Sequence, residues 1–470
     1  MPVPTESLSS ARSVPWVVLA LVFLVSLPAV TTRLYASDEI EYFAYLRSLY
    51  FDRDLQFENE YRYFYDRNIA RAHSFKETFI DFVTPTGHRR NFAPIGSAVL
   101  WAPFFAVADA GVRAARFFGS GVAADGFSRP YISAITYASA AYGFLALVLS
   151  AIAARHVTGV TAGALAAVCF GTPLVFYMYV APGFSHANSA FAVAAFVVAW
   201  MYVRDRWSPA GVAALGALAA LMGMVREQDL FIALGPAIDY AVTMGQAVRE
   251  GRRSLVEMLG TAAVGVVAGV ICFLPQAIAY LTLNGYVGPS PVVQQKMTWT
   301  SPHAWRVLMS PDNGWFFWTP LAVPALVGLI ALAFKGSPER RWIGTVCLIM
   351  VATQIYVSGS VNTWAGAGSF GQRRLVGLTV FLVIGLAALL QMARTGWARV
   401  AVNAIVVICV WWNLGLIAQF ATGMMDRNRM EPAPNAYNNF VTVPLEFPGL
   451  AYRYVFDRQS FYQSRTPAPH

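Results

Sequence analysis

The stretch from Leu255 to Leu283, LVEMLGTAAVGVVAGVICFLPQAIAYLTL, indicates the fold class of this chain more clearly than any other. After Glu257 it carries no charged residue, and its apolar run is longer than the roughly 20 residues that a helix needs to cross a bilayer. A helix on the surface of a soluble protein would keep a polar face, which this stretch lacks. The stretch therefore predicts a membrane-spanning helix.

Similar apolar blocks recur along the chain, which is 57% hydrophobic and 13% charged. Soluble chains have about 25% charged residues, so the composition also favours a membrane protein. We predict an all-α polytopic membrane protein with about 11 transmembrane helices, within a range of about 10 to 13. The spans are expected at about residues 14–31, 131–154, 161–180, 189–203, 210–225, 229–245, 255–283, 314–333, 342–358, 375–392 and 398–420.

The first block is expected to be a retained span rather than a signal peptide. Pro15 and Trp16 open it, and no small-residue cleavage site follows. The orientation of the spans follows from the short loops, because loops rich in Lys and Arg stay in the cytoplasm. One alternating set of short loops carries eleven such residues and the opposite set carries three. The eleven are Arg155, Arg204, Arg206, Arg249, Arg252, Arg253, Lys335, Arg340, Arg341, Arg394 and Arg399.

With that set in the cytoplasm, together with the N-terminus, three longer segments face outside: 32–130, 284–313 and 421–470. We expect residues 1–420 to form the transmembrane domain and 421–470 to form an outer C-terminal tail. Within the first outer loop, 92–112 is apolar but interrupted by Pro94 and Pro103. As a span it would place the arginine-rich loops outside, so we predict helices that lie in the interface or re-enter from it.

The net charge of +9 does not indicate nucleic acid as a partner, because the basic residues are spread over short loops. Each of the four cysteines lies inside an apolar block and none forms a CxxC pair, which predicts neither a disulfide framework nor a zinc site. No D-x-D or HExxH pattern occurs. We therefore expect no cofactor. A divalent metal held by Asp38, Glu39 and Glu41 stays an alternative without support from the spacing.

The acidic candidates are Asp38 and Glu39, directly outside the first span in the stretch Ser37–Tyr42. A carboxylate at the membrane surface can deprotonate a hydroxyl when proton transfer accompanies attack and the site is dry. The alternative is structural, because Asp and Glu in a first helical turn complement the helix dipole.

The basic candidates are the three outer arginines, Arg226, Arg373 and Arg374. A guanidinium group binds a phosphate through two parallel hydrogen bonds, and these residues break the positive-inside pattern. The alternatives are an ion pair of Arg226 with Asp229 and snorkelling of Arg373 and Arg374 to lipid headgroups.

Four further residues are candidates for contact with the acceptor: Ser185, His186, Asn313 and Trp364. Ser185 and His186 lie in a short outer loop. A lone histidine at the end of a span can equally be a satisfied interface residue. By composition, the turn and aromatic belt around Asn313 form an interfacial anchor.

Five stretches occur in an order that carries a family resemblance. They are Ser37-Asp38-Glu39; Asn91–Gly96 with Leu100–Phe105; Phe170-Gly171-Thr172-Pro173; the Ser-Pro…Gly…Thr-Pro segment at 310–320; and Trp364 followed by Phe370-Gly371-Gln372-Arg373-Arg374. In this order the chain, from about 14 to 392, resembles the membrane-embedded glycosyltransferases of the GT-C superfamily. It is most similar to the bacterial branch that includes protein O-mannosyltransferase-like and aminoarabinose-transferase-like enzymes.

The resemblance implies a catalytic Asp at position 38, a second outer loop that contributes to the site, and a lipid-phosphate donor that enters beside the spans. Two departures matter. Many relatives carry an acidic residue in the second outer loop where this chain has Ser185 and His186, which argues against a shared metal. The lysine that some relatives carry before the interface helix is missing, and Arg89 and Arg90 lie near that place.

The expected function is transfer of a sugar from a polyprenyl-phosphate donor to a glycolipid, polysaccharide or protein acceptor, by single displacement with inversion. Asp38 would act as the base, and the arginines would hold the phosphate. The expected location is a bacterial inner membrane with the site facing the periplasm. The first alternative is a transporter or flippase, but transporters concentrate ionisable residues near the bilayer midplane. The second is a non-catalytic membrane scaffold.

Overall fold

The computed structural model describes residues 16–457 and Ser460, apart from Arg71, Val160, Thr161, Ala367 and Arg394. The first two residues of the predicted first span and the end of the C-terminal tail lie outside this range. Within it every regular element is a helix, and the strand-like pairings are two isolated bridges, Val83 with Arg89 and Met297 with Val361. The predicted all-α class is confirmed.

Each predicted span corresponds to a helix or to a pair of consecutive helices. Eight helices in the described residues are long and apolar enough to cross a membrane, and four shorter ones are apolar. The spans are α1 (Trp16–Ser26), α5 (Arg129–Thr158), α6 (Ala162–Gly171) with α7 (Leu174–Tyr179), α8 (His186–Val203), α9 (Pro209–Val225), η4 (Glu227–Ala233) with α10 (Leu234–Arg249), α11 (Leu255–Asn284), α14 (Trp315–Trp318) with α15 (Ala322–Phe334), α16 (Pro338–Gly359), η5 (Arg373–Leu378) with α17 (Thr379–Met392), and α18 (Gly396–Thr422).

The span predicted at 161–180 is interrupted at Thr172 and Pro173, between α6 and α7. Proline has no amide hydrogen and disrupts the preceding helical turn. The carbonyl groups freed by the break still need donors inside a membrane. Asn413 on α18 supplies them, because its Nδ2 donates to Phe170 O at 2.8 Å and to Thr172 O at 3.0 Å.

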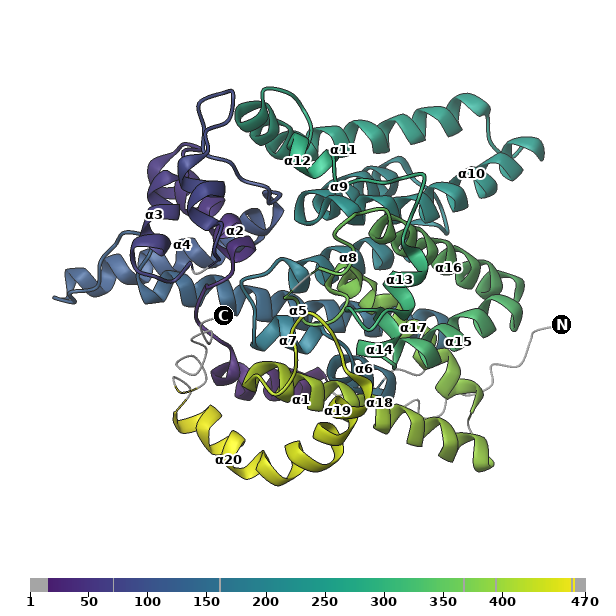
Figure 1. Ribbon diagram of the computed structural model, residues 1–470. Helices are drawn as coiled ribbons and strands as arrows, with labels where there is room; N and C mark the ends of the chain where they lie inside the picture. The colour runs from purple at the N-terminus through teal and green to yellow at the C-terminus, as the bar shows by residue number, and fades with distance from the viewer. Residues whose placement is uncertain are drawn as a thin grey trace.

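Helices α5, α8 and α17 form the middle of the bundle, and α9 and α11 pack on one side of it (Figure 1). Glycines allow the closest approaches. A Cβ atom at Gly216 of α9 would lie 1.9 Å from the carbonyl oxygen of Gly265 in α11, and one at Gly328 of α15 would lie 1.9 Å from that of Gly385 in α17. Small residues at helix crossings are typical of membrane bundles, because they let backbones touch.

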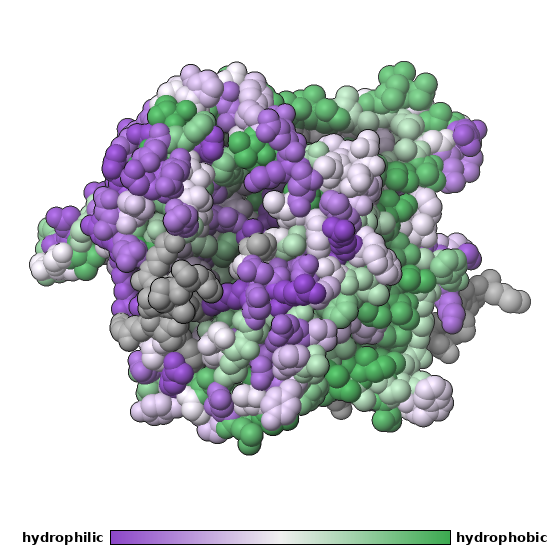
Figure 2. All heavy atoms as spheres, viewed as in Figure 1, coloured by the Kyte–Doolittle hydropathy of each residue, from purple (hydrophilic) through white to green (hydrophobic). Residues whose placement is uncertain are grey.

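The first outer loop folds into a unit of its own beside the bundle. It contains α2 (Ser37–Arg47), η2 (Ser48–Asp52), α3 (Glu58–Asp66), η3 (Lys76–Asp81) and α4 (Gly96–Phe117). Buried aromatic side chains, among them Phe43, Phe57, Tyr61 and Phe75, form its core. Figure 2 shows hydrophilic residues gathered over this unit on the left and hydrophobic residues over the spans on the right.

Helix α4 contains the segment predicted to lie at the interface. It begins where Gly96 packs on the backbone of Met224 and Val225, at the outer end of α9. From there it runs antiparallel to the outer half of α5, where Trp101 Nε1 donates to Ser139 Oγ at 2.9 Å. Its length and composition alone would also allow a span. Its contacts pair it with residues 131–142 of α5, and its place at the interface stays a prediction.

Short helices complete the outer side of the molecule. Helices α12 (Pro291–Gln294) and α13 (Ala304–Met309) lie in the loop after α11, and α19 (Pro432–Tyr437), η6 (Asn438–Thr442) and α20 (Val443–Phe456) follow α18. The tail is tied to α18, because Gln419 Nε2 donates to Asn435 O at 3.1 Å and Asn435 Nδ2 donates to Gln419 Oε1 at 2.9 Å.

The α9–α11 crossing generates a stability prediction. Gly216→Ala should lower the melting temperature in detergent, because overpacking a tight contact costs about 1–3 kcal/mol. Gly260→Ala, on α11, is the control: a Cβ there meets nothing within 4 Å, so the better helix propensity of alanine should leave the melting temperature unchanged or raise it. Equal melting temperatures for the two variants would contradict the close crossing.

Candidate active site

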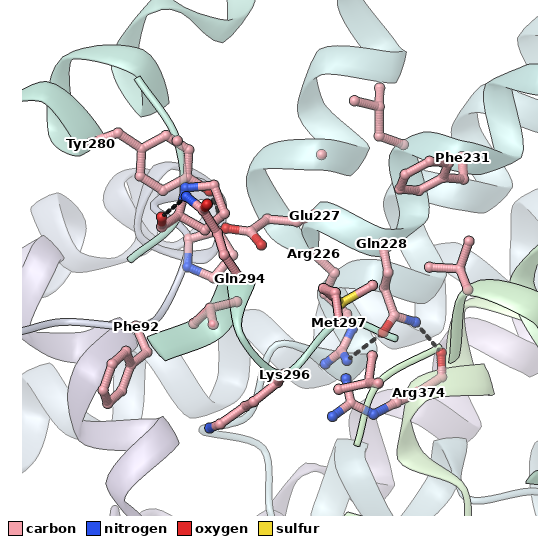
Figure 3. A pocket seen from close by; sticks show the side chains of 18 of the residues that line it. Phe92, Arg226, Glu227, Gln228, Phe231, Tyr280, Gln294, Lys296, Met297 and Arg374 are labelled. Atoms are coloured by element: carbon pink, nitrogen blue, oxygen red, sulfur yellow. Dashed lines mark hydrogen bonds between the residues drawn. The ribbon is translucent and has the colours of Figure 1, made fainter. Parts of the chain in front are cut away.

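A cavity of about 810 Å³ lies where the outer loop unit meets the outer ends of the spans. Its walls come from α2, the junction of α9 with η4, α11, the loop that follows α11, and the start of η5. Figure 3 shows side chains from these segments pointing into one space, with the guanidinium groups of Arg226 and Arg374 next to each other. The charged residues in its lining are Asp38, Arg226, Glu227, Lys296, Arg373 and Arg374.

Asp38 lies in the first turn of α2 and is ion-paired with Arg373. The Nη1 group of Arg373 donates to Asp38 Oδ2 at 2.7 Å, and the two side chains are 22% and 44% exposed. Both residues are therefore partly open to the cavity. A snorkelling Arg373 would point to lipid headgroups, whereas this one points to a carboxylate on another segment.

Glu39, the second predicted catalytic residue, turns away from the cavity and caps α2. Its Oε2 accepts from the backbone amides of Tyr35 at 2.9 Å and Ala36 at 3.0 Å, which satisfies donors at the start of the helix. A Cβ at Gly183 would lie 2.8 Å from Glu39 Oε1, so only glycine fits there. Burial raises the pKa of the Glu39 carboxyl to about 7. The Glu39 carboxyl is thus fully buried and bonded to the backbone, apart from the cavity lining, and its catalytic role stays a prediction.

Arg226 lies at the break between α9 and η4, where its backbone is extended. Its Nη1 donates to His186 Nδ1 at 2.9 Å and lies 3.4 Å from Ser185 Oγ, and Nη2 lies 3.4 Å from Gln228 Oε1. Among the described residues no ion pair joins Arg226 to Asp229, which instead accepts from Ser189 Oγ at 2.5 Å. The ion-pair alternative is therefore not what the structure shows.

Ser185 and His186 lie behind Arg226 rather than on the cavity surface. Their side chains are 0% and 1% exposed, and neither lines the cavity. Ser185 Oγ donates to Tyr42 Oη at 2.8 Å, which links this loop to α2. The two residues support an arginine and a tyrosine that line the cavity, and their contact with the acceptor stays a prediction.

Arg373 and Arg374 open η5 after a tight glycine turn. Gly371 has φ +63°, and a Cβ there would lie 3.1 Å from Pro173, so the turn needs glycine for its conformation and for its close approach. Gln228 Nε2 donates to Arg374 O at 2.6 Å, and Arg374 Nη2 donates to Thr363 Oγ1 at 3.2 Å. These bonds hold Arg374 beside Arg226.

Trp364 and Asn313, the other predicted acceptor residues, do not line the cavity. Asn313 is buried and its Nδ2 donates to Ala365 O at 2.9 Å, while Trp364 O accepts from Gln372 Nε2 at 3.1 Å. The two residues hold in place the loop that carries the arginines. Their contact with the acceptor stays a prediction.

Arg89 and Arg90 are also away from the cavity. Arg89 Nη2 forms an ion pair with Glu58 Oε2 at 2.6 Å, and the guanidinium carbon of Arg90 lies 3.3 Å from the centre of the Phe82 ring. Both side chains have partners within the outer loop unit, and their contact with a lipid phosphate stays a prediction.

Lys296 takes a place in the cavity that the sequence analysis missed. It comes from the loop after α11, which is pinned to the end of α16 because Thr298 N donates to Ser360 O at 2.6 Å and Asn362 N donates to Lys296 O at 2.8 Å. Its ammonium nitrogen lies 5.8 Å from the centre of the Phe92 ring. Only its place in an outer loop, flanked by polar residues, hinted at such a position.

The cavity lining therefore holds four cations and two carboxylates. Asp38 is paired with Arg373. Glu227 accepts a hydrogen bond from the Tyr280 hydroxyl. The surplus positive charge favours an anionic ligand, because cations held in an apolar setting are costly without a partner. In the described part of the chain, no three His, Cys, Asp or Glu side chains converge as metal ligands.

A second cavity of about 650 Å³ lies next to the first, between α9, α10 and α11. It is lined almost wholly by apolar side chains, and it shares Leu230, Phe273 and Val287 with the charged cavity. The charged cavity and this apolar groove are thus neighbours that share part of their walls.

No protein-family model matches the chain, and no curated protein is similar at a significant level. Among solved structures, the chain is similar to ArnT from Cupriavidus metallidurans bound to undecaprenyl phosphate, with a TM-score of 0.51 and 16% identity. The match covers 96% of this chain and 73% of ArnT. The chain has the fold of this ArnT. The same ArnT in the apo state gives a TM-score of 0.49 and 15% identity.

The GT-C resemblance seen in the sequence is thereby confirmed at the level of the fold. The GT-C fold places the α2 carboxylate and the η5 arginine, which are 335 residues apart, within hydrogen-bond distance. At this level of identity the likeness shows the fold, and the chemistry must be argued from the side chains of this chain.

The buried carboxyl of Glu39 generates a pH prediction. Its pKa is raised from 4.5 to about 7, so the folded state holds a proton that the unfolded state loses. The wild type should therefore become less stable than Glu39→Gln as pH rises from 4.5 to 7, by up to about 3 kcal/mol, with no further change above 7. Melting temperatures across this range measure the effect. Glu77→Gln, at the exposed surface, controls for the lost charge. A difference that does not change with pH would contradict the buried, protonated Glu39.

Proposed function

We propose that this protein transfers a sugar from a polyprenyl-phosphate carrier to an acceptor hydroxyl on the outer face of the bacterial inner membrane. The observation that carries the proposal is a pair of neighbouring cavities, one lined by Asp38 and four cations and the other almost wholly apolar. A lipid phosphate has a matching shape and polarity. Its phosphate neutralises the surplus cations, and its isoprenoid chain fills the groove that leads into the spans.

The similarity to ArnT supports the choice of ligand. That protein was solved with undecaprenyl phosphate bound, and its fold is shared over 96% of this chain. The acceptor is proposed as a hydroxyl of a glycolipid, polysaccharide or protein. No nucleotide is required, because the energy of the reaction is stored in the bond between the sugar and the lipid phosphate.

The proposed mechanism is a single displacement at the anomeric carbon. The acceptor hydroxyl loses its proton to the Asp38 carboxylate as its oxygen forms the new glycosidic bond. The bond from the anomeric carbon to the phosphate oxygen breaks, and the electron pair leaves with the lipid phosphate. Arg226, Arg373, Arg374 and Lys296 stabilise the charge that develops there. Because the nucleophile enters opposite the leaving group, the product is inverted.

The ion pair between Asp38 and Arg373 has a role in this cycle. Its two partners are the proposed base and a proposed phosphate ligand, 2.7 Å apart without substrate. A bound phosphate competes with Asp38 for the guanidinium group. Binding of the donor thereby releases a carboxylate oxygen toward the acceptor, where it is needed.

A transporter is disfavoured by where the charges lie. The cavity charges are at the outer ends of the spans. The buried Asp239 on α10 is engaged structurally, because its carboxylate accepts from Trp200 Nε1 at 2.8 Å, Trp342 Nε1 at 2.6 Å and Arg204 Nε at 3.0 Å. A carboxylate with three donors ties helices together and is not free to bind a solute.

Asp38→Asn should lower kcat by about 10²–10⁴-fold, because the amide cannot take the proton. The assay follows labelled sugar from a panel of polyprenyl-phosphate donors to membrane acceptors, with wild type, Asp38→Asn and the control Asp66→Asn. Asp66 is an exposed residue of the same outer unit, so its variant should turn over like wild type.

Near-normal turnover by Asp38→Asn would remove its assignment as the base. Movement of the lipid across the bilayer without any glycosidic product would favour the transporter. A product of retained anomeric configuration would contradict single displacement.

A further inference from the structure

The short loop segment Gly183–His186, whose last residue begins α8, contacts α2, Arg373 and Arg226. Gly183 packs on Glu39, next to Asp38, and the Phe184 ring lies 5.6 Å from the guanidinium carbon of Arg373. Ser185 bonds Tyr42 of α2, and His186 bonds Arg226. The loop is thus placed to set the relative positions of the base and the arginines, although it does not line the cavity itself.

The imidazole ring of His186 is fixed on two sides by aromatic rings. It stacks on Phe184 with ring centres 5.7 Å apart and planes inclined by 16°, and it meets Tyr177 edge-on at 4.3 Å. Tyr177 is anchored in turn, since its hydroxyl donates to Phe370 O at 3.1 Å. The direction of Nδ1 is therefore set by packing.

The protonation state of the ring follows from its partner. A guanidinium group only donates hydrogen bonds, so the Nδ1 atom that lies 2.9 Å from Arg226 Nη1 must accept. His186 is then neutral, with its proton on Nε2, and Nε2 is buried without a hydrogen-bond partner among the described residues. Neither nitrogen is available to take a proton from an acceptor hydroxyl.

We infer that His186 is a positioning residue that aims the guanidinium of Arg226 at the lipid phosphate. The inference rests on the proposed function and deepens it by naming how the donor site is preformed. Without the Nδ1 acceptor, Arg226 would keep two hydrogen-bond contacts among the described residues, both at 3.4 Å. The carboxylates of Asp38 and Glu227 line the same cavity and would then compete for Arg226 with the phosphate.

Two substitutions of nearly equal shape isolate this hydrogen bond. In His186→Asn, the amide oxygen stands where Nδ1 stood and can accept from Arg226. In His186→Leu, the side chain has a similar volume and no acceptor. Both variants lose the same ring contacts with Phe184 and Tyr177, so any difference between them reports the polar atom.

The measurement is the affinity of each purified protein for undecaprenyl phosphate, with undecaprenol as the ligand that lacks the phosphate. His186→Asn should bind within about threefold of wild type. His186→Leu should bind about tenfold more weakly or worse, since a charged donor has lost its partner. The two variants should bind undecaprenol equally. In transfer assays the loss should appear in KM for the donor more than in kcat.

Arg226→Met provides the second arm. In that background, His186→Asn and His186→Leu should bind undecaprenyl phosphate equally, because their difference acts through Arg226. Should His186→Leu fail to fold, as judged by its melting temperature, Ser185→Ala removes the other acceptor of the same Nη1 group with a smaller change in volume. It should weaken binding of the phosphate lipid and leave undecaprenol unaffected.

The outcomes separate the two claims. Three results would overturn the positioning role and leave the proposed function standing. The first is equal affinity of His186→Asn and His186→Leu for undecaprenyl phosphate, and the second is a difference between them that persists in the Arg226→Met background. The third, where Ser185→Ala replaces the Leu variant, is an affinity of Ser185→Ala equal to that of wild type. A folded wild-type protein that binds neither undecaprenyl phosphate nor any sugar-charged form would overturn the proposed function, and the inference with it.

Discussion

The ion pair between Asp38 and Arg373 is the constraint on which the rest of the site depends. It joins the outer loop unit to the membrane bundle, through residues 335 positions apart in sequence. The four cations that line the cavity repel one another, and the two carboxylates offset only part of that charge. The resting protein is thus left with a net positive site, which an anionic ligand completes. Asp38 and Arg373 thus hold the outer loop unit to the bundle and also take part in the proposed reaction.

The supporting residues show how an exposed charge pair is kept in one geometry. Glu39 caps the helix that carries Asp38, and Gly371 gives the turn that precedes Arg373. Ser185 reaches Tyr42 and His186 reaches Arg226 from a loop that is buried beneath them. Each of these contacts fixes an ionic group through a neighbour with little freedom of its own. A site of this kind loses little entropy on binding, because its side chains are already ordered.

The sequence predicted the spans well, because a helix must be apolar over a minimum length to cross a bilayer whatever its neighbours are. It missed the break at Thr172 and Pro173, since the side chain that satisfies the freed carbonyl, Asn413, lies 241 residues away.

In the site, the sequence identified Asp38, Arg226, Arg373 and Arg374, because charged residues next to apolar spans are costly unless they have a partner. Arg89 and Arg90 were named because they lie near the place of a lysine that some relatives carry, but Glu58 and Phe82 engage them within the outer loop unit. The sequence did not identify Lys296, because the loop after α11 is positioned by its pairing with the end of α16. Only this pairing determines which residue of the loop faces the cavity.

The central claim is that a lipid phosphate binds in the charged cavity, with its chain in the neighbouring apolar groove. A cryo-electron microscopy structure of the protein in nanodiscs with undecaprenyl phosphate tests this claim most directly. The account predicts phosphate density within hydrogen-bond distance of Arg226 and of Arg373 or Arg374, with the isoprenoid chain running past Leu230 and Phe273 into the groove. A phosphate bound at Arg89 and Arg90, or at the cytoplasmic ends of the spans, would contradict it.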